Sequence, residues 1–141
     1  MNDMIIGTGC DIIDIERIEK SIQKESFVRR VFTKREQDMS GGKASFYADN
    51  FAVKEAVSKC FGTGVRGFCL TDIECLRDEF GKPYVVLHGN AGDIAEKMKI
   101  SDIQISISNT KSLSMAFAVA QQKGKAERYE KSPDGFTDEG N

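Results

Sequence analysis

The sequence predicts an α+β fold in which helices pack on one small, mainly antiparallel sheet. Segments 6–12, 103–107 and 113–119 alternate apolar residues with small or polar ones, which is the period of a strand. The segments between them carry apolar residues three and four positions apart, which is the period of a helix. At 141 residues and 40% hydrophobic content, the chain suits one domain. We expect that domain at 1–122, followed by a polar, mobile tail at 123–141.

The first expected strand, 6–12, has an open face. Gly7, Gly9 and Asp11 share one side of it, and two residues without side chains allow a ligand or another backbone to come close. Asp14 follows as the expected N-cap of a helix. The apolar positions of that helix are Ile15, Ile18 and Ile22.

Three further helical segments are expected before the middle of the chain. Residues 27–32 suggest one helical turn, and Thr33 with Glu36 fits a capping box that starts the next short helix. A longer helix over 44–61 ends at Gly62. Its predicted apolar stripe is Phe46, Val53, Val57 and Cys60.

The second half of the chain predicts two hairpins around one helix. Segments 71–77 and 84–87 are expected strands joined through DEFGKP, and Asn90 is the expected cap of a helix carrying Ile94 and Met98. The strands at 103–107 and 113–119 are joined by a turn at 109–112.

Composition excludes several classes of protein. The 20 basic and 22 acidic residues leave a net charge of −2, which disfavours nucleic-acid binding. No apolar run reaches the roughly 18 residues that span a bilayer, and the N-terminus lacks the pattern of a signal peptide. With one histidine and no C-x-x-C pair, a zinc site is not expected. We expect the four cysteines to be free, mostly buried thiols of a reducing compartment.

The candidate chemistry rests on three charged side chains. Glu55 and Lys59 lie four residues apart, on one face of the long helix. If the glycine-flanked strand packs against that helix, Asp11 and Glu55 can hold one Mg²⁺ ion, and Lys59 can meet a phosphate oxygen. Plainer interpretations stay open: a helix-surface ion pair for Glu55 and Lys59, a local hydrogen bond for Asp11, and a C-cap with a turn for 62–64. The stretch 16–36, with a net charge of +3, also reads as an ordinary solvated face.

An ordered set of motifs gives these residues a more specific meaning. The chain resembles bacterial holo-acyl-carrier-protein synthase, the small 4'-phosphopantetheinyl transferase of fatty acid synthesis, over about residues 4–120. The resemblance is carried by GTGCDI at 7–12, Arg17-Ile18, Thr33 with Glu36, FAVKEAVSKCFGTG at 51–64, GKP at 81–83 and SISNTK at 106–111.

The resemblance implies an activity, a cofactor and partners. It implies transfer of 4'-phosphopantetheine from coenzyme A to a serine of acyl carrier protein, with release of 3',5'-ADP, by a cytoplasmic homotrimer with active sites between subunits. It makes Asp11 and Glu55 the magnesium ligands and, with Lys59, the catalytic residues. It assigns docking of the acidic carrier protein to Arg17, Lys20 and Lys24. It assigns coenzyme A binding to Lys59, Gly62, Thr63, Gly64, Pro83, Asn50, Asn109 and Thr110.

Two departures from the family pattern leave alternatives open. Asn109 stands where the family usually has His, and Asn50 where it often has Arg. Because asparagine carries no charge, the two changes predict weaker discrimination between coenzyme A and its 3'-dephospho form. They also motivate a second hypothesis, an inactive relative that only binds carrier protein or nucleotide. A third is a metal-dependent phosphohydrolase, although no further acid or histidine clusters by motif to serve as its base.

Overall fold

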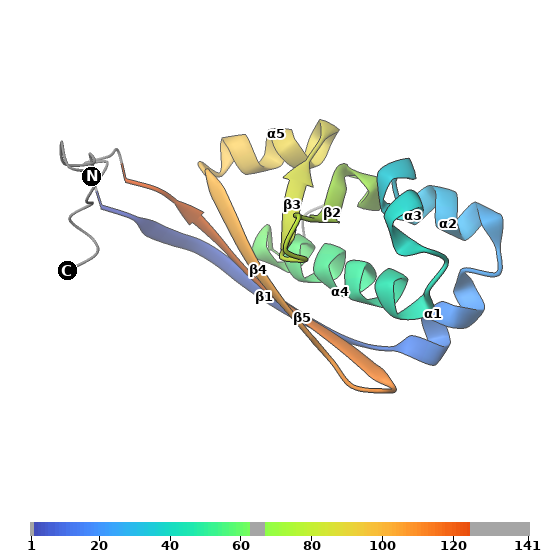
Figure 1. Cartoon of the computed structure of the whole chain (residues 1–141). Helices are drawn as coiled ribbons and strands as arrows, with labels where there is room; N and C mark the ends of the chain where they lie inside the picture. The colour runs from blue at the N-terminus through green and yellow to red at the C-terminus, as the bar shows by residue number, and fades with distance from the viewer. Residues whose placement is uncertain (1, 63–66, 125–141) are drawn as a thin grey trace.

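A computed structural model describes residues 2–62 and 67–124 of the chain (Figure 1). The predicted tail lies almost entirely outside these residues, and its predicted boundary falls at the end of the last strand. The elements are, in order, β1 (Met4–Asp14), α1 (Ile15–Ser21), α2 (Glu25–Val31), α3 (Lys34–Ser40), α4 (Ala44–Cys60), a 3₁₀ turn (Leu70–Asp72), β2 (Ile73–Arg77), β3 (Pro83–Leu87), α5 (Gly89–Lys97), β4 (Asp102–Asn109) and β5 (Leu113–Gln122).

The strands form two antiparallel sheets, where the sequence predicted one. Strands β1, β5 and β4 pair in that order, and β2 pairs only with β3. Strands β3 and β4 are neighbours, but a hollow of about 470 Å³ lies between them, lined by residues such as Tyr84, Val85, Ile103 and Ile105. Backbone pairing needs strands about 4.8 Å apart, so the hollow separates the two sheets. The α+β class itself is confirmed.

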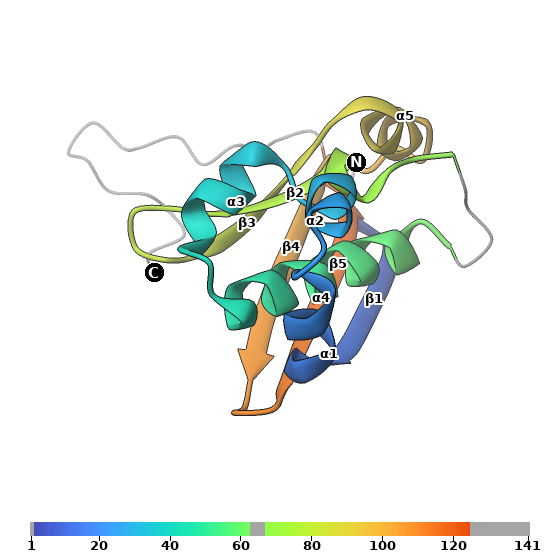
Figure 2. The same ribbon diagram turned by 90° about the vertical axis from the view of Figure 1, so that its right-hand side faces the viewer.

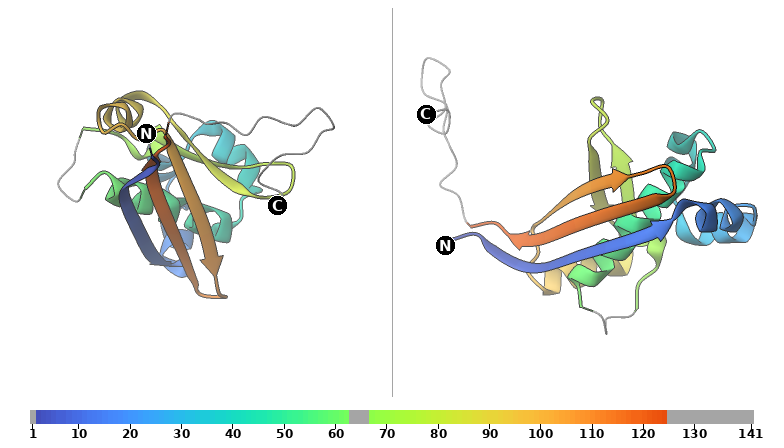
Figure 3. Two further views of the ribbon diagram at one scale, coloured as in Figure 1. Left: turned by 90° about the vertical axis from the view of Figure 1, so that its left-hand side faces the viewer. Right: turned by 90° about the horizontal axis from the view of Figure 1, so that it is seen from below.

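Helix α4 lies across one face of the three-stranded sheet, and the described helices all lie on that side (Figures 1 and 2). None of the described elements covers the opposite face of the sheet (Figure 3). Small residues contribute to this contact, because Ala116, Ala118 and Ala120 of β5 and Ala52 and Ala56 of α4 are all fully buried, and the two elements pack together. Their size lets the helix lie close to the strands.

The glycine face of β1 is the closest part of this contact. A Cβ atom at Gly9 would stand 1.9 Å from the Ala56 carbonyl oxygen, and one at Gly7 would stand 2.3 Å from that of Cys60. The open face predicted for this strand therefore receives another backbone, that of α4. The same alternation turns Ile12 outward, where its side chain is 62% exposed.

The helix ends agree with the sequence at some positions and differ at others. Thr33 and Glu36 form the predicted capping box. Asp14 occupies the N-cap position of α1, but its side chain makes no capping hydrogen bond. Helix α5 begins two residues earlier than expected, because the Gly92 N–H already donates to the His88 carbonyl and His88, not Asn90, is the N-cap.

Polar side chains are buried where α4 meets α3 and β2. Glu36 is fully buried and accepts hydrogen bonds from Lys54 Nζ (2.7 Å), Asn50 Nδ2 (2.8 Å) and the backbone N–H groups of Cys75 and Thr33. Helix α4 is therefore buried well beyond its predicted stripe, on a polar side as well as an apolar one.

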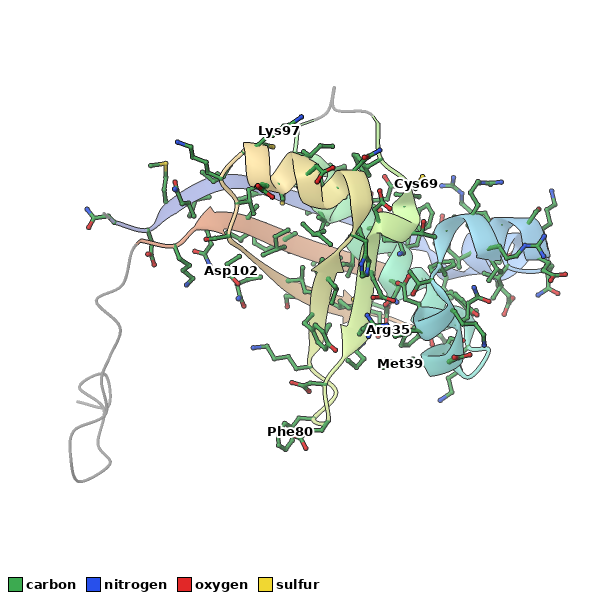
Figure 4. All side chains as sticks on the ribbon, turned by 90° about the horizontal axis from the view of Figure 1, so that it is seen from above. Arg35, Met39, Cys69, Phe80, Lys97 and Asp102 are labelled. Atoms are coloured by element: carbon green, nitrogen blue, oxygen red, sulfur yellow. The ribbon has the colours of Figure 1, made fainter. Side chains whose placement is uncertain are left out.

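The four cysteines and the β2–β3 hairpin differ in their exposure to solvent. All four cysteines are free, as predicted, but only Cys60 and Cys75 are buried, whereas Cys10 and Cys69 are exposed. The β2–β3 hairpin projects from the body and carries Phe80 near its tip (Figure 4). Within the described residues, no helix is long and apolar enough to cross a membrane.

Candidate active site

The fold brings Asp11, Glu55 and Lys59 together between β1 and α4. The Lys59 ammonium donates to the Cys10 carbonyl (2.8 Å) and lies 3.5 Å from Asp11 Oδ1. Glu55 lies one turn earlier on the same helix. Lys59 therefore bridges to β1, and the simple surface pair between Glu55 and Lys59 is not formed. Asp11 lies within β1, three residues before the strand ends.

The electrostatics of Glu55 show how closely these groups interact. Burial raises the pKa of the Glu55 carboxyl above its ordinary value, and the neighbouring Asp11 carboxylate raises it further. Lys59 and Arg17 act in the opposite direction. Two partly buried carboxylates thus lie near an exposed lysine and an exposed arginine at the junction of β1, α1 and α4.

The donor chemistry of this region suits a hard divalent cation. Mg²⁺ is commonly held by one or two carboxylates, with water and substrate phosphates completing the octahedron. Burial is the main cause of the raised pKa of Glu55, and a cation between Asp11 and Glu55 would relieve the repulsion that adds to it. Within the described residues, no group of three or more His, Cys, Asp or Glu side chains gathers for a metal. Any ion here would depend on oxygen atoms from water or substrate.

The predicted docking residues line two adjoining hollows beside this region. Arg17 and Lys20 line the first, together with Asp14 and Glu16, at the junction of α1 with the β4–β5 turn. Lys20 also lines the second, between α1 and α2, which includes Lys24, Phe27 and Arg30. Lys20 pairs with Glu16 at 3.4 Å, although both side chains are more than three-quarters exposed. Together the two hollows form a surface with more basic than acidic residues, which extends from Arg17, near Glu55, to Arg30.

The residues predicted to bind coenzyme A lie in different parts of the structure. Pro83 and Asn109 line one hollow of about 430 Å³ with Asp49, Arg77 and Lys82. Thr110 is exposed beside it, where its hydroxyl accepts hydrogen bonds from the backbone N–H groups of Ser112 and Leu113 within the β4–β5 turn. Gly62, with a φ of 108°, directly follows α4 and its C-cap. Thr63 and Gly64 lie outside the described residues.

Asn50 does not reach the surface of this hollow. Its side chain is fully buried and its polar atoms are satisfied there: Nδ2 donates to Glu36 and to the Cys75 carbonyl, and Oδ1 accepts from Arg77. Arg77 itself lines the hollow, and the sequence analysis did not select it. Its place at the end of a strand just before the GKP motif was the available signal.

Comparison with known proteins agrees with this fold and site. The family model for the 4'-phosphopantetheinyl transferase superfamily matches residues 7–119, so the chain belongs to that superfamily. Within it, the chain is similar to proteins named holo-[acyl-carrier-protein] synthase. It is 47% identical to that of Fusobacterium nucleatum, over 82% of this chain and 98% of the relative, and 43% identical to that of Lachnoclostridium phytofermentans, over 84% and 97%.

A solved structure extends the likeness to three dimensions. The holo-(acyl-carrier-protein) synthase of Bacillus anthracis, in complex with CoA (3',5'-ADP), is similar with a TM-score of 0.70 and 32% identity, covering 85% of this chain and 99% of that one. The resemblance drawn from the motifs is therefore confirmed at the level of family and fold.

Proposed function

We propose that this protein transfers 4'-phosphopantetheine from coenzyme A to a serine of apo acyl carrier protein, giving holo carrier protein and 3',5'-ADP in fatty acid biosynthesis. The observation that carries the proposal is the convergence of Asp11, Glu55 and Lys59 in a member of this superfamily. Because the nucleophile belongs to the carrier protein, the enzyme needs positioning and charge neutralisation rather than a nucleophile of its own.

The residues divide the work of the transfer. The carrier serine oxygen attacks the pantetheine-side phosphorus of the coenzyme A pyrophosphate, a P–O bond forms, and the bond to the departing 3',5'-ADP breaks with its electron pair. Lys59, freed from the Cys10 carbonyl, offers three N–H donors to the pyrophosphate. We propose that the serine proton passes to water or to Glu55.

Magnesium dependence is part of the proposal. Asp11 and Glu55 would hold the ion, since they are the paired carboxylates of the site. When bound, Mg²⁺ supplies neutralisation of charge on the pyrophosphate and the leaving phosphate. Lys59, Gly62, Pro83, Asn109 and Thr110 remain the proposed coenzyme A contacts, and we extend the same role to Thr63 and Gly64.

The proposed carrier surface is the basic face formed by Arg17, Lys20 and Lys24. Acyl carrier proteins are acidic, and complementary charge speeds the encounter of two proteins. The position of Arg17 supports this surface, because the same residue acts on the charge of Glu55 and so lies where a docked serine must arrive.

We also propose a homotrimer with active sites between subunits. The support is the bare face of the three-stranded sheet, where Ile12, Met115 and Phe117 are 62%, 42% and 43% exposed. Apolar side chains gathered on one face are typical of an interface. Light scattering should give a trimer mass for the native chain, and Phe117→Glu should shift it toward the monomer. A native monomer that still transfers the group would contradict this part.

We also propose a cytoplasmic location, because the reaction needs coenzyme A and newly made carrier protein in the same compartment.

One assay separates the candidate functions. The protein is incubated with coenzyme A, Mg²⁺ and apo acyl carrier protein, and the carrier mass is followed by mass spectrometry. A phosphopantetheine increment supports the transferase, 3',5'-ADP without an increment supports a phosphohydrolase, and neither product supports an inactive relative. Asp11→Asn and Glu55→Gln should nearly abolish transfer, whereas the control Glu96→Gln, on the exposed face of α5, should not.

A further inference from the structure

Arg77 is held in one orientation at the end of β2. Its Nη2 donates to Asn50 Oδ1 at 2.8 Å, and its Nη1 donates to Cys75 Sγ at 3.2 Å and to the Leu76 carbonyl at 3.4 Å. The guanidinium carbon lies 4.5 Å from the centre of the Phe46 ring, a cation–π contact. These partners are neutral, and none of the ion pairs in the described part of the chain includes Arg77. The arginine is thus oriented without being neutralised.

Asn50 is a rigid support for this arginine. It is fully buried, and its Nδ2 group is already bonded to Glu36 and to the Cys75 carbonyl. Those two bonds require donation from the nitrogen, so the oxygen is left to face Arg77. The polar network between α3, α4 and β2 therefore ends on the guanidinium that enters the hollow.

The hollow beside Arg77 favours an anion. Arg77 and Lys82 contribute two positive charges to its lining, and Asp49 contributes one negative charge. The Asp49 carboxylate is already occupied, because it accepts from Asn109 Nδ2 at 3.0 and 3.1 Å and from the Ser114 hydroxyl at 2.6 Å. The planar guanidinium keeps N–H groups that suit the paired oxygens of a phosphate.

We infer that Arg77 reads the 3'-phosphate of coenzyme A in this chain. The inference rests on the proposed function, which assigns the pyrophosphate to Asp11, Glu55 and Lys59. The phosphate that remains for the hollow at Arg77 is the one on the ribose, whether the nucleotide lies within one protomer or across an interface. Pro83 and Asn109, expected near the nucleotide, line the same hollow.

This assignment revises the expectation drawn from Asn50 and Asn109. Where the family often has Arg, this chain has Asn50, whose side-chain oxygen accepts a hydrogen bond from Arg77. In this chain the positive charge that lines the hollow lies at the end of β2. The native protein should therefore retain a clear preference for coenzyme A over its 3'-dephospho form.

The test compares two substrates in three proteins. Values of kcat/KM are measured with coenzyme A and with 3'-dephospho-coenzyme A, for the native chain, Arg77→Gln and the control Lys97→Gln, which removes one exposed charge from α5 (Figure 4). A hydrogen-bonded charge on phosphate corresponds to a loss of about tenfold or more. Arg77→Gln should lose that factor for coenzyme A, mainly in KM, and change less than about twofold for the dephospho form.

Direct binding separates this inference from the proposed function. Adenosine 3',5'-bisphosphate and adenosine 5'-monophosphate, which differ by the 3'-phosphate alone, are titrated calorimetrically into the same three proteins. Preference for the bisphosphate should fall about tenfold in Arg77→Gln and remain in Lys97→Gln. Equal losses for both ligands, or no native preference, would overturn the role of Arg77 even if transfer is active. Absence of transfer with this preference intact would instead count against the proposed reaction.

Discussion

Replacing Lys54 should lower the free energy of unfolding by a large amount. Its side chain is fully buried, and its ammonium donates to Glu36 Oε1 (2.7 Å) and to the carbonyls of Leu70 (3.0 Å) and Ile73 (2.5 Å). Burial lowers the pKa of Lys54, although the attraction of Glu36 acts against that shift. The cost of dehydrating the ammonium thus outweighs the pull of its partner, and the pair is held in place by the surrounding fold.

Substitution Lys54→Met keeps the length of the side chain and removes its charge. Glu36 would then be buried without its cation, and breaking a buried pair in this way costs about 3–5 kcal/mol. Against a total stability of roughly 5–15 kcal/mol, this is a large share. At about 2–4 °C per kcal/mol, we expect the melting temperature to fall by about 10 °C.

Urea unfolding at pH 7, followed by circular dichroism, measures this cost. The matched control is Lys59→Met on the same helix, whose half-exposed ammonium pairs with Asp11 and should contribute less than about 1 kcal/mol. The double variant Lys54→Met with Glu36→Leu should recover part of the loss, because no buried charge is left unpaired. Equal destabilisation by Lys54→Met and Lys59→Met would refute the reasoning.

Three further predictions follow from the contacts of the site and its surroundings. The Cβ of Gly9→Ala would displace α4, so this change should lower the free energy of unfolding, measured in urea, by about 1–3 kcal/mol. It should also raise the Mg²⁺ concentration needed for transfer. The control is Gly92→Ala, where the nearest atom to the added Cβ is 3.8 Å away. Burial alone would raise the pKa of Glu74, but hydrogen bonds from Arg35, Thr33 and His88 lower it from 4.5 to about 2. Its stabilising effect, up to about 3 kcal/mol, is therefore complete above pH 4.5 and lost as the pH falls toward 2. Glu74→Gln should cost stability at pH 7 and progressively less in acid, and a constant difference across that range would contradict this. Arg17→Glu should raise KM for apo carrier protein several-fold at low salt, less at high salt, and leave KM for coenzyme A unchanged; an effect on coenzyme A alone would place the docking face elsewhere.

The sequence was sufficient for the parts of the site that follow from local periodicity. Strand alternation placed Asp11 on the glycine face, and a four-residue helical spacing placed Glu55 beside Lys59. Which residue Lys59 contacts depends on the packing of β1 against α4, a non-local contact that periodicity does not encode.

The polar interior was not predictable in this way. Lys54 reads as a surface residue because lysines are rarely buried, and only the approach of α3 and β2 to α4 provides its three acceptors. The bond between Asn50 and Arg77 joins residues 27 positions apart on a helix and a strand. Likewise, the separation of the strands into two sheets, with a hollow between β3 and β4, depends on tertiary packing that strand periodicity does not encode.

The backbone contact of Gly7 and Gly9 with α4 has a consequence for how the protein can change over generations. The helix carbonyls lie directly against the strand, so main-chain atoms set the position of Asp11 relative to Glu55. Core side chains elsewhere can therefore be substituted without changing that relative position. Arg77, Lys82 and Asn109 lie instead on β2, the β2–β3 loop and β4. Selection, or a directed library, can therefore alter the choice of nucleotide at those positions while the chemical centre stays constant, and substitutions at the two glycines should be purged from any such library.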